Sequence, residues 1–283
     1  MDPIHIDGRE YKLLLKPAKF AGDPSAALAN NFWNHHLKPI IKGALDKRSG
    51  GKARWKGHFG AAKVRSVFYR DSKSHVLDSI DLSLRRRGKA DGKQEITLKL
   101  RTSDLFISAL TPVTGSSPYA RTKLEEDIAP LQVQKRKVVA DYGNTRSRFS
   151  RSTTQPLAGD QLPGTLAQAC KLFPSLVQDL MRGGLSLKTP LISGPALDEH
   201  VFKGPKVELG SGISAEFTLT LWYRGRKRQK PYVSEISFRC ATDDGFMPLP
   251  AARRAHLLFV AMQKDLAGWV DTENSSKTAL ALP

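Results

Sequence analysis

Basic residues stand at every second position in two neighbouring segments of the sequence, a spacing that suits the binding of phosphate. In the first segment Leu82 and Leu84 alternate with Ser83, Arg85 and Arg87, and in the second Lys99 and Arg101 alternate with apolar residues. This period-two alternation is typical of half-buried strands, and the Asp-Gly pair at 91–92 predicts a tight hairpin turn between them. The hairpin would place all four basic side chains on one face, where their N–H groups can bind phosphate oxygens.

Four like charges on one face of a sheet are unfavourable unless something compensates them. Carboxylates on neighbouring strands or a bound anion would do so. The alternative interpretation is a solvated surface face, which is the commoner fate of a run of charges. The recurrence of the same pattern in other segments favours a ligand.

Alternation of apolar and charged residues marks strands in both halves of the chain. Because so many strands have one charged face, we expect a closed or strongly curved sheet, with helices over an apolar outside and a polar, ligand-holding interior. The opposite arrangement, with charge facing solvent, stays open. The predicted class is α+β, an antiparallel β-barrel with flanking helices. The other predicted strands are 10–16, 64–69, 119–127, 131–139, 217–223 and 232–240.

Helices and connections are predicted from caps and breakers. Asp23 and Pro24 would cap and open the first helix, which extends to about residue 41. We expect three later helices, and Ser- and Gly-rich composition predicts a flexible linker at 143–163 and irregular chain at 185–212. The chain is therefore expected to be one domain, 1–283, with an insertion at about 143–212. The later helices are predicted at 163–173, 175–181 and 250–270.

The composition favours a polyanionic partner. The 283 residues include 45 Lys and Arg against 27 Asp and Glu, a formal net charge of +18, with 40% hydrophobic residues. Such a charge favours nucleotides, polyphosphate, nucleic acid or anionic lipid, although an ordinary basic protein would share it.

Several other classes of protein are disfavoured. Cys170 and Cys240 form no CxxC pair, so we expect two buried reduced thiols rather than a zinc site or a disulfide framework. The N-terminus has no apolar leader-like segment, and no long apolar run predicts a membrane span, so a cytoplasmic location is expected. The sequence holds no phosphate-binding P-loop, no dinucleotide-binding fingerprint and no nucleophile elbow.

Taken in order, the predicted strands resemble the CYTH or triphosphate tunnel family, which includes thiamine triphosphatases, inorganic triphosphatases and class IV adenylyl cyclases. The resemblance spans roughly residues 8 to 239 and depends on the order and parity of short motifs. These motifs are Gly8-Arg-Glu10-Tyr-Lys12, Phe68-Tyr69-Arg70-Asp71, Leu84-Arg85-Arg86-Arg87, Thr97-Leu98-Lys99, Glu125-Glu126-Asp127, Lys135-Arg136-Lys137 and Glu235-Ile-Ser237.

The resemblance implies a protein that binds a triphosphate-bearing nucleotide or inorganic ligand and processes it with Mg²⁺ or Mn²⁺, as a triphosphatase or a nucleotide cyclase-like enzyme. Each implied metal carboxylate has an alternative role as an ion-pair partner. The implied metal ligands are Glu10, Glu125, Asp127 and Glu235. The implied phosphate-binding residues are Lys12, Arg85, Arg87, Lys99, Arg101, Arg136 and Arg239.

Two departures from the family pattern weaken the case for catalysis. Gly8 and Ser237 stand where the family has carboxylates. A chain that keeps its basic residues but loses metal ligands would bind a nucleotide, polyphosphate or RNA without cleaving it. A third alternative is a nucleic-acid-binding protein of unrelated fold, for which the basic segment 224–230 is a candidate contact.

Overall fold

The computed structural model describes residues 4–48, 52–131, 145–157, 162–225, 229–242, 244–274, 277–278 and 280–283. It divides into two compact units, with boundaries that fall inside four of the strands, β3, β6, β7 and β9. The first unit comprises residues 1–63, 126–147 and 199–277. The second comprises 64–125, 148–198 and 278–283.

The strands form one hydrogen-bonded sheet in the order β2-β9-β10-β11-β1-β6-β7-β5-β4-β3-β8, and a further pairing joins β9 to β3. That pairing closes a ring of strands from β9 through β11, β1 and β5 back to β3, which confirms the predicted α+β barrel with flanking helices. The strands are β1 (Gly8–Leu15), β2 (Trp55–Lys56), β3 (Lys63–Asp71), β4 (Leu82–Lys89), β5 (Gln94–Thr102), β6 (Arg121–Pro130), β7 (Thr145–Pro156), β8 (Ile192–Ser193), β9 (Leu197–Gly210), β10 (Ile213–Arg224) and β11 (Val233–Ala241).

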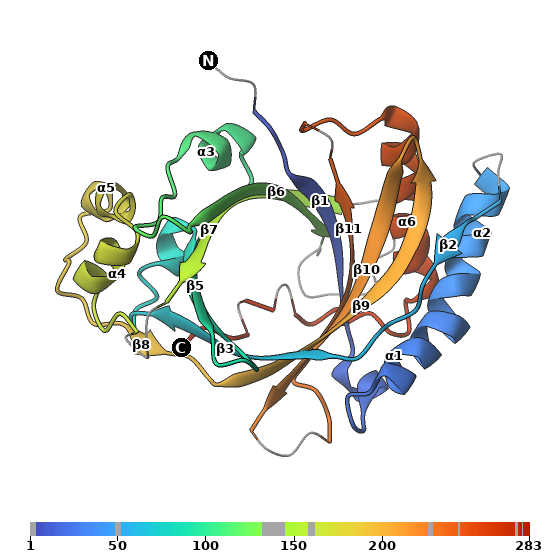
Figure 1. The fold of residues 1–283 in the computed structure, drawn as a ribbon, viewed down its shortest axis with the longest axis horizontal. Helices are drawn as coiled ribbons and strands as arrows, with labels where there is room; N and C mark the ends of the chain where they lie inside the picture. The colour runs from blue at the N-terminus through green and yellow to red at the C-terminus, as the bar shows by residue number, and fades with distance from the viewer. Residues whose placement is uncertain are drawn as a thin grey trace. The chain divides into compact units, whose positions relative to one another are not determined.

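In the first unit, helices cover the apolar face of the strands. In Figure 1, α1 (Ala26–Phe32), α2 (Lys38–Arg48) and α6 (Leu249–Asp265) lie beside β9, β10 and β11. One buried cluster joins the helices to these strands, and Tyr11 of β1 stacks on Phe238 of β11 with 4.6 Å between ring centroids. The opposite face of these strands carries the polar residues.

The first helix begins later than its sequence predicted. Ser25, not Asp23, is the N-cap, because its Oγ accepts a hydrogen bond of 3.2 Å from the backbone N–H of Leu28. Helix α1 continues through one π-helical turn, Trp33–Leu37, into α2. The helical segment extends beyond the predicted end at about residue 41, and its apolar residues Phe32, Leu37 and Ile41 are buried.

In the second unit, the hairpin of β4 and β5 packs its leucine-rich face against α4 (Leu166–Leu172) and α5 (Leu176–Arg182). Gly92 has a φ of +78°, which the predicted turn requires. A further helix, α3 (Leu105–Leu110), follows β5. Both α4 and α5 confirm predicted helices within a few residues.

Two predictions about irregular chain are wrong. The expected linker at 143–163 contains β7, and the expected irregular stretch at 185–212 contains β9. The Ser- and Thr-rich composition concealed β7, although Thr pairs well in sheets. In β9, Gly204 interrupts the alternation because His58 lies so close that a side chain on Gly204 would meet its carbonyl oxygen.

Among the described residues, none of the helices has both the length and the apolar character needed to cross a membrane. Both cysteines are free and buried, as predicted.

Candidate phosphate-binding faces

The β4–β5 hairpin places its basic residues on one face, as its sequence predicted. Arg85 lies opposite Thr97, Arg87 lies opposite Glu95, and Lys99 lies opposite Ser83. Residues directly opposite each other in an antiparallel pair share a face. No two of these cations are therefore directly opposed, which reduces the repulsion that the sequence suggested.

A row of hydroxyl groups continues this face onto the next strand. In β7, Ser150 lies opposite Arg101, Ser152 opposite Lys99, and Thr154 opposite Thr97. The hydroxyls of Thr97 and Thr154 are 2.8 Å apart and share a hydrogen bond. Cations interleaved with hydroxyls can offer a phosphate both charge and neutral donors.

The motif around Asp71 has a structural role in the second unit. Its carboxylate is fully buried and accepts backbone N–H groups from Ser72 at 2.7 Å, Leu77 at 2.8 Å and Asp78 at 3.0 Å. These bonds fix the turn that leads into β4. Asp71 therefore positions the strand that carries Arg85 and Arg87.

In the first unit, the polar face of β1 carries an acid–base cluster. Lys12 Nζ lies 2.7 Å from Asp127 Oδ1 and 3.0 Å from Glu10 Oε2. Burial acts to raise the pKa of Glu10, but the attraction of Lys12 and then Lys277 outweighs burial, so this pKa lies below its ordinary value. The cluster holds an ammonium group between two carboxylates.

The strand registers put three more predicted residues on this same face. Glu235, Ser237 and Arg239 of β11 lie opposite Leu14, Lys12 and Glu10, in that order. Glu235 is only 4% exposed, and its Oε1 accepts a hydrogen bond of 2.5 Å from Lys277 Nζ. Glu10, Lys12, Glu235 and Arg239 therefore lie on one face, as their positions in the strands predicted. The carboxylates of Glu10 and Glu235 are ion-paired with Lys12 and Lys277.

Arg239 lies over Gly8, where the resemblance implies a carboxylate. Its Nη2 donates to the Asp7 carbonyl at 2.8 Å, and a Cβ built on Gly8 would stand 2.6 Å from the same nitrogen. A side chain at position 8 would therefore displace the guanidinium group. At this position a cation lies where the resemblance implies a metal ligand.

Three of the four predicted metal ligands are held in ion pairs in this arrangement. Lys12 is ion-paired with both Glu10 and Asp127, and Lys277 is ion-paired with Glu235. Within the described ranges, no group of three or more His, Cys, Asp or Glu residues lies close enough to hold a metal. Divalent Mg²⁺ or Mn²⁺ would have to compete with these lysines for the carboxylates.

The remaining predicted residues lie elsewhere. Glu125 lies on β6 two residues before Asp127, with the boundary of the units between them, and Arg136 lies outside the described residues. Glu126 lies between Glu125 and Asp127 on β6. Its carboxylate accepts hydrogen bonds from Arg9 Nε at 2.5 Å and from Ser147 Oγ at 2.6 Å. Arg9 alternates with Glu10 on β1, so this pair belongs to the other face of the strand.

Sequence reasoning missed three contributors in the first unit. Lys277 comes from the segment after α6, for which the sequence predicted no element, and its ammonium lies 5.6 Å from the ring centroid of Trp222. The Trp222 indole in turn donates to Glu199 Oε1 at 3.2 Å. No local pattern could reveal Lys277, because its partner Glu235 is 42 positions away. The Ser and Thr alternation in 150–154 was a visible signal for the hydroxyl row of the second unit.

The site and fold define the class as an α+β barrel whose strands bear basic and hydroxyl-lined faces. No family model and no curated protein matches the chain. Among solved structures, the chain is similar to a candidate adenylyl cyclase from Hippeastrum described as having a dominant triphosphatase activity, with 12% identity, a TM-score of 0.44 and 96% and 93% of the two chains covered.

Two further similarities are to candidate adenylate cyclases of bacteria. For Bacillus halodurans the identity is 14% and the TM-score 0.41, with 96% of this chain and 95% of that chain covered. For Vibrio parahaemolyticus the identity is 10% and the TM-score 0.33, with 98% of each chain covered.

Proposed function

We propose that the protein binds a ligand carrying a chain of phosphate groups, such as a nucleoside triphosphate or inorganic polyphosphate. The observation that supports this most is the register of the β4–β5 hairpin, which interleaves Arg85, Arg87 and Lys99 with hydroxyl groups on one face. One guanidinium group can donate two parallel hydrogen bonds to two oxygens of a phosphate, and the ammonium of Lys99 adds a point charge.

The polar face of the first unit supports a metal-independent mode of binding. There the carboxylates are matched by Lys12 and Lys277, and Arg239 covers Gly8. A bound phosphate would either replace the carboxylates as the partner of these cations or bind the cations together with the carboxylates. Binding therefore needs no divalent ion to neutralise the ligand, because the chain supplies the positive charge itself. We further propose that the two units serve as one functional domain.

The hairpin arginines are the groups to change first. We expect Arg85→Gln to weaken binding of tripolyphosphate by about 10- to 150-fold, the loss of one charge-assisted hydrogen-bond set worth about 1.5–3 kcal/mol. Titration calorimetry in EDTA measures this. Arg253→Gln, at an exposed arginine on α6, is the matched control and should bind as the wild type does. Equal affinity of the Arg85→Gln variant and the control would overturn the proposal.

A second candidate function is hydrolysis or cyclisation of a triphosphate with Mg²⁺ or Mn²⁺. It is favoured by one observation, that Glu10 and Glu235 share a face with Lys12. Phosphate or pyrophosphate release from tripolyphosphate and nucleoside triphosphates, with the metal varied, tests this function. Metal-dependent turnover that Glu235→Gln abolishes would establish an enzyme, whereas binding without turnover would leave the non-catalytic function.

A further inference from the structure

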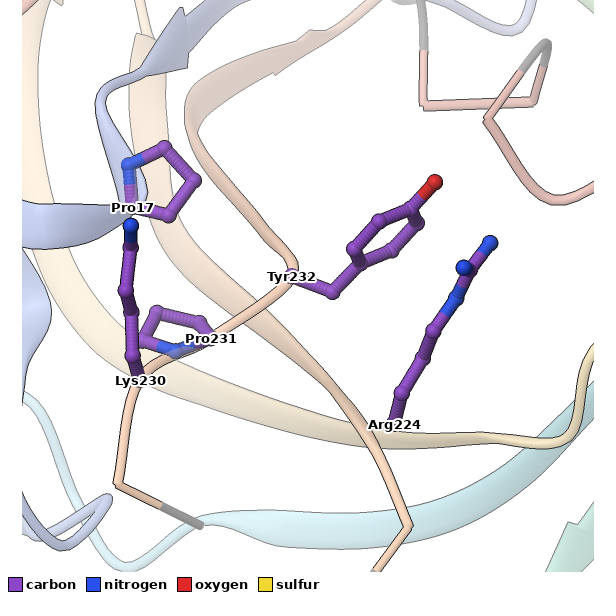
Figure 2. A pocket seen from close by; sticks show the side chains of 5 residues that line it. All are labelled: Pro17, Arg224, Lys230, Pro231 and Tyr232. Carbon is purple, nitrogen blue, oxygen red and sulfur yellow. The ribbon is translucent and has the colours of Figure 1, made fainter. Parts of the chain in front are cut away.

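A small pocket lies at the base of the connection between β10 and β11, in the first unit. Its volume is about 320 Å³, and Figure 2 shows Tyr232 between the two basic side chains, with both prolines on the side of Lys230. Its lining residues are Pro17, Arg224, Lys230, Pro231 and Tyr232. All five are basic, aromatic or proline, and none is acidic.

The backbone holds the walls of this pocket in place. Tyr232 N–H donates to the Trp222 carbonyl at 2.6 Å, which ties the two strands together at the pocket. The Gln229 carbonyl accepts a hydrogen bond of 2.8 Å from Gly22, beyond the 3₁₀ turn Pro17–Phe20. The pocket is therefore built from two chain segments that are hydrogen-bonded to each other.

The Arg224 guanidinium stacks on the ring of Tyr232, with its central carbon 3.6 Å from the ring centroid. Stacking on the ring fixes the plane of the guanidinium group. A cation fixed in this way can bind a phosphate with less loss of side-chain entropy than a mobile lysine. Lys230, on the other side of the ring, supplies a second positive charge.

The combination of a flat ring, two prolines and two cations matches the chemistry of a nucleotide. Stacking surfaces take bases of any sequence, and neighbouring cations take the backbone phosphates. The volume is at the lower end of the ~300–1,000 Å³ range of small-ligand sites, so it suits one ring rather than a large ligand. A duplex would not offer such a ring, because its bases are stacked inside.

We propose that this pocket is a contact site for single-stranded nucleic acid, separate from the phosphate-binding faces. One base packs against Tyr232 and the prolines, and adjacent phosphates bind Arg224 and Lys230. The formal net charge of +18 supports the association by attracting polyanions. The inference does not depend on the proposed function, because none of its residues belongs to those faces.

The test is fluorescence anisotropy of a labelled mixed-sequence RNA oligonucleotide, measured from about 50 to 200 mM salt. We expect the double variant Arg224→Ala/Lys230→Ala to bind more weakly and to lower the slope of log affinity against log salt by about 1.4, or ~0.7 for each phosphate that is no longer neutralised. We expect Tyr232→Ala to lose about 5- to 150-fold in affinity, because stacking of one base is worth ~1–3 kcal/mol.

Three controls separate this site from other causes. Tyr232→Phe keeps the ring and should retain affinity, which shows that loss in Tyr232→Ala is not a folding defect. Lys264→Ala, at an exposed lysine of α6, should barely change the slope. Arg253→Gln, at an exposed arginine of α6, should leave RNA binding unchanged.

Three results would contradict the inference. The first is wild-type protein that does not bind the oligonucleotide at the lowest salt. The second is a double variant whose affinity and salt slope equal those of Lys264→Ala. Duplex RNA that binds as tightly, with the same loss in Tyr232→Ala, would contradict the base contact.

Discussion

At the scale of single residues, Asp71 shows how a buried charge can serve the fold rather than the ligand. We predict that Asp71→Asn lowers the free energy of unfolding by about 1–3 kcal/mol, because an amide cannot accept three backbone N–H groups as a carboxylate does. Urea denaturation measures this. Asp91→Asn is the control, since Asn-Gly suits the same hairpin turn, and should stay within about 0.5 kcal/mol of wild type. Equal stability of the two variants would contradict this role.

Lys12 is the residue whose removal should change the pH dependence of stability. The lowered pKa of Glu10 gives stability that is present above its unfolded pKa and is lost as pH falls through the folded pKa. Lys12→Met removes this stabilisation and leaves two carboxylates close together. We therefore expect a lower melting temperature at neutral pH, and a difference from wild type that shrinks as the pH falls below the ordinary value of 4.5. A difference that grows on acidification would contradict the account.

At the scale of elements, the C-terminal segment contributes to the polar face of the first unit through Lys277. We predict a coupling energy of about 1–3 kcal/mol between Lys277 and Glu235 in a double-mutant cycle of Lys277→Ala and Glu235→Gln, because the carboxylate is nearly buried. The exposed pair Lys206–Glu216 is the matched control and should couple by less than about 1 kcal/mol. Similar couplings for both pairs would mean that the tail is not docked at Glu235.

The success of the sequence-based predictions also differs by element. The β4–β5 hairpin could be predicted almost completely, because alternation and an Asp-Gly turn are local signals. Strand β9 could not, because Gly204 is required by a close approach of His58, a residue 146 positions away in the sequence. Alternation also predicted which face of its strand each of Glu10, Lys12 and Glu235 lies on. The pairing of Glu235 with Lys277 could not be predicted in this way, because it depends on where the C-terminal segment folds.

At the scale of the whole molecule, some of the positive charge lies beside carboxylates, both on the hairpin face and on the polar face of the first unit. Arg87 lies opposite Glu95, and Lys12 lies between Glu10 and Asp127. The sequence predicted which residues share a face but overestimated the repulsion between them, since repulsion depends on the register of neighbouring strands. It also implied metal ligands that the observed lysine pairing does not favour.

The most direct test of phosphate binding is NMR detection of arginine side-chain Nε–H signals during titration with tripolyphosphate in EDTA. We predict that the signals of Arg85 and Arg87 shift together and saturate, while that of Arg253 does not move. Shifts confined to exposed arginines such as Arg253, or shifts at Arg85 and Arg87 only after a divalent metal is added, would contradict metal-independent binding on the hairpin face.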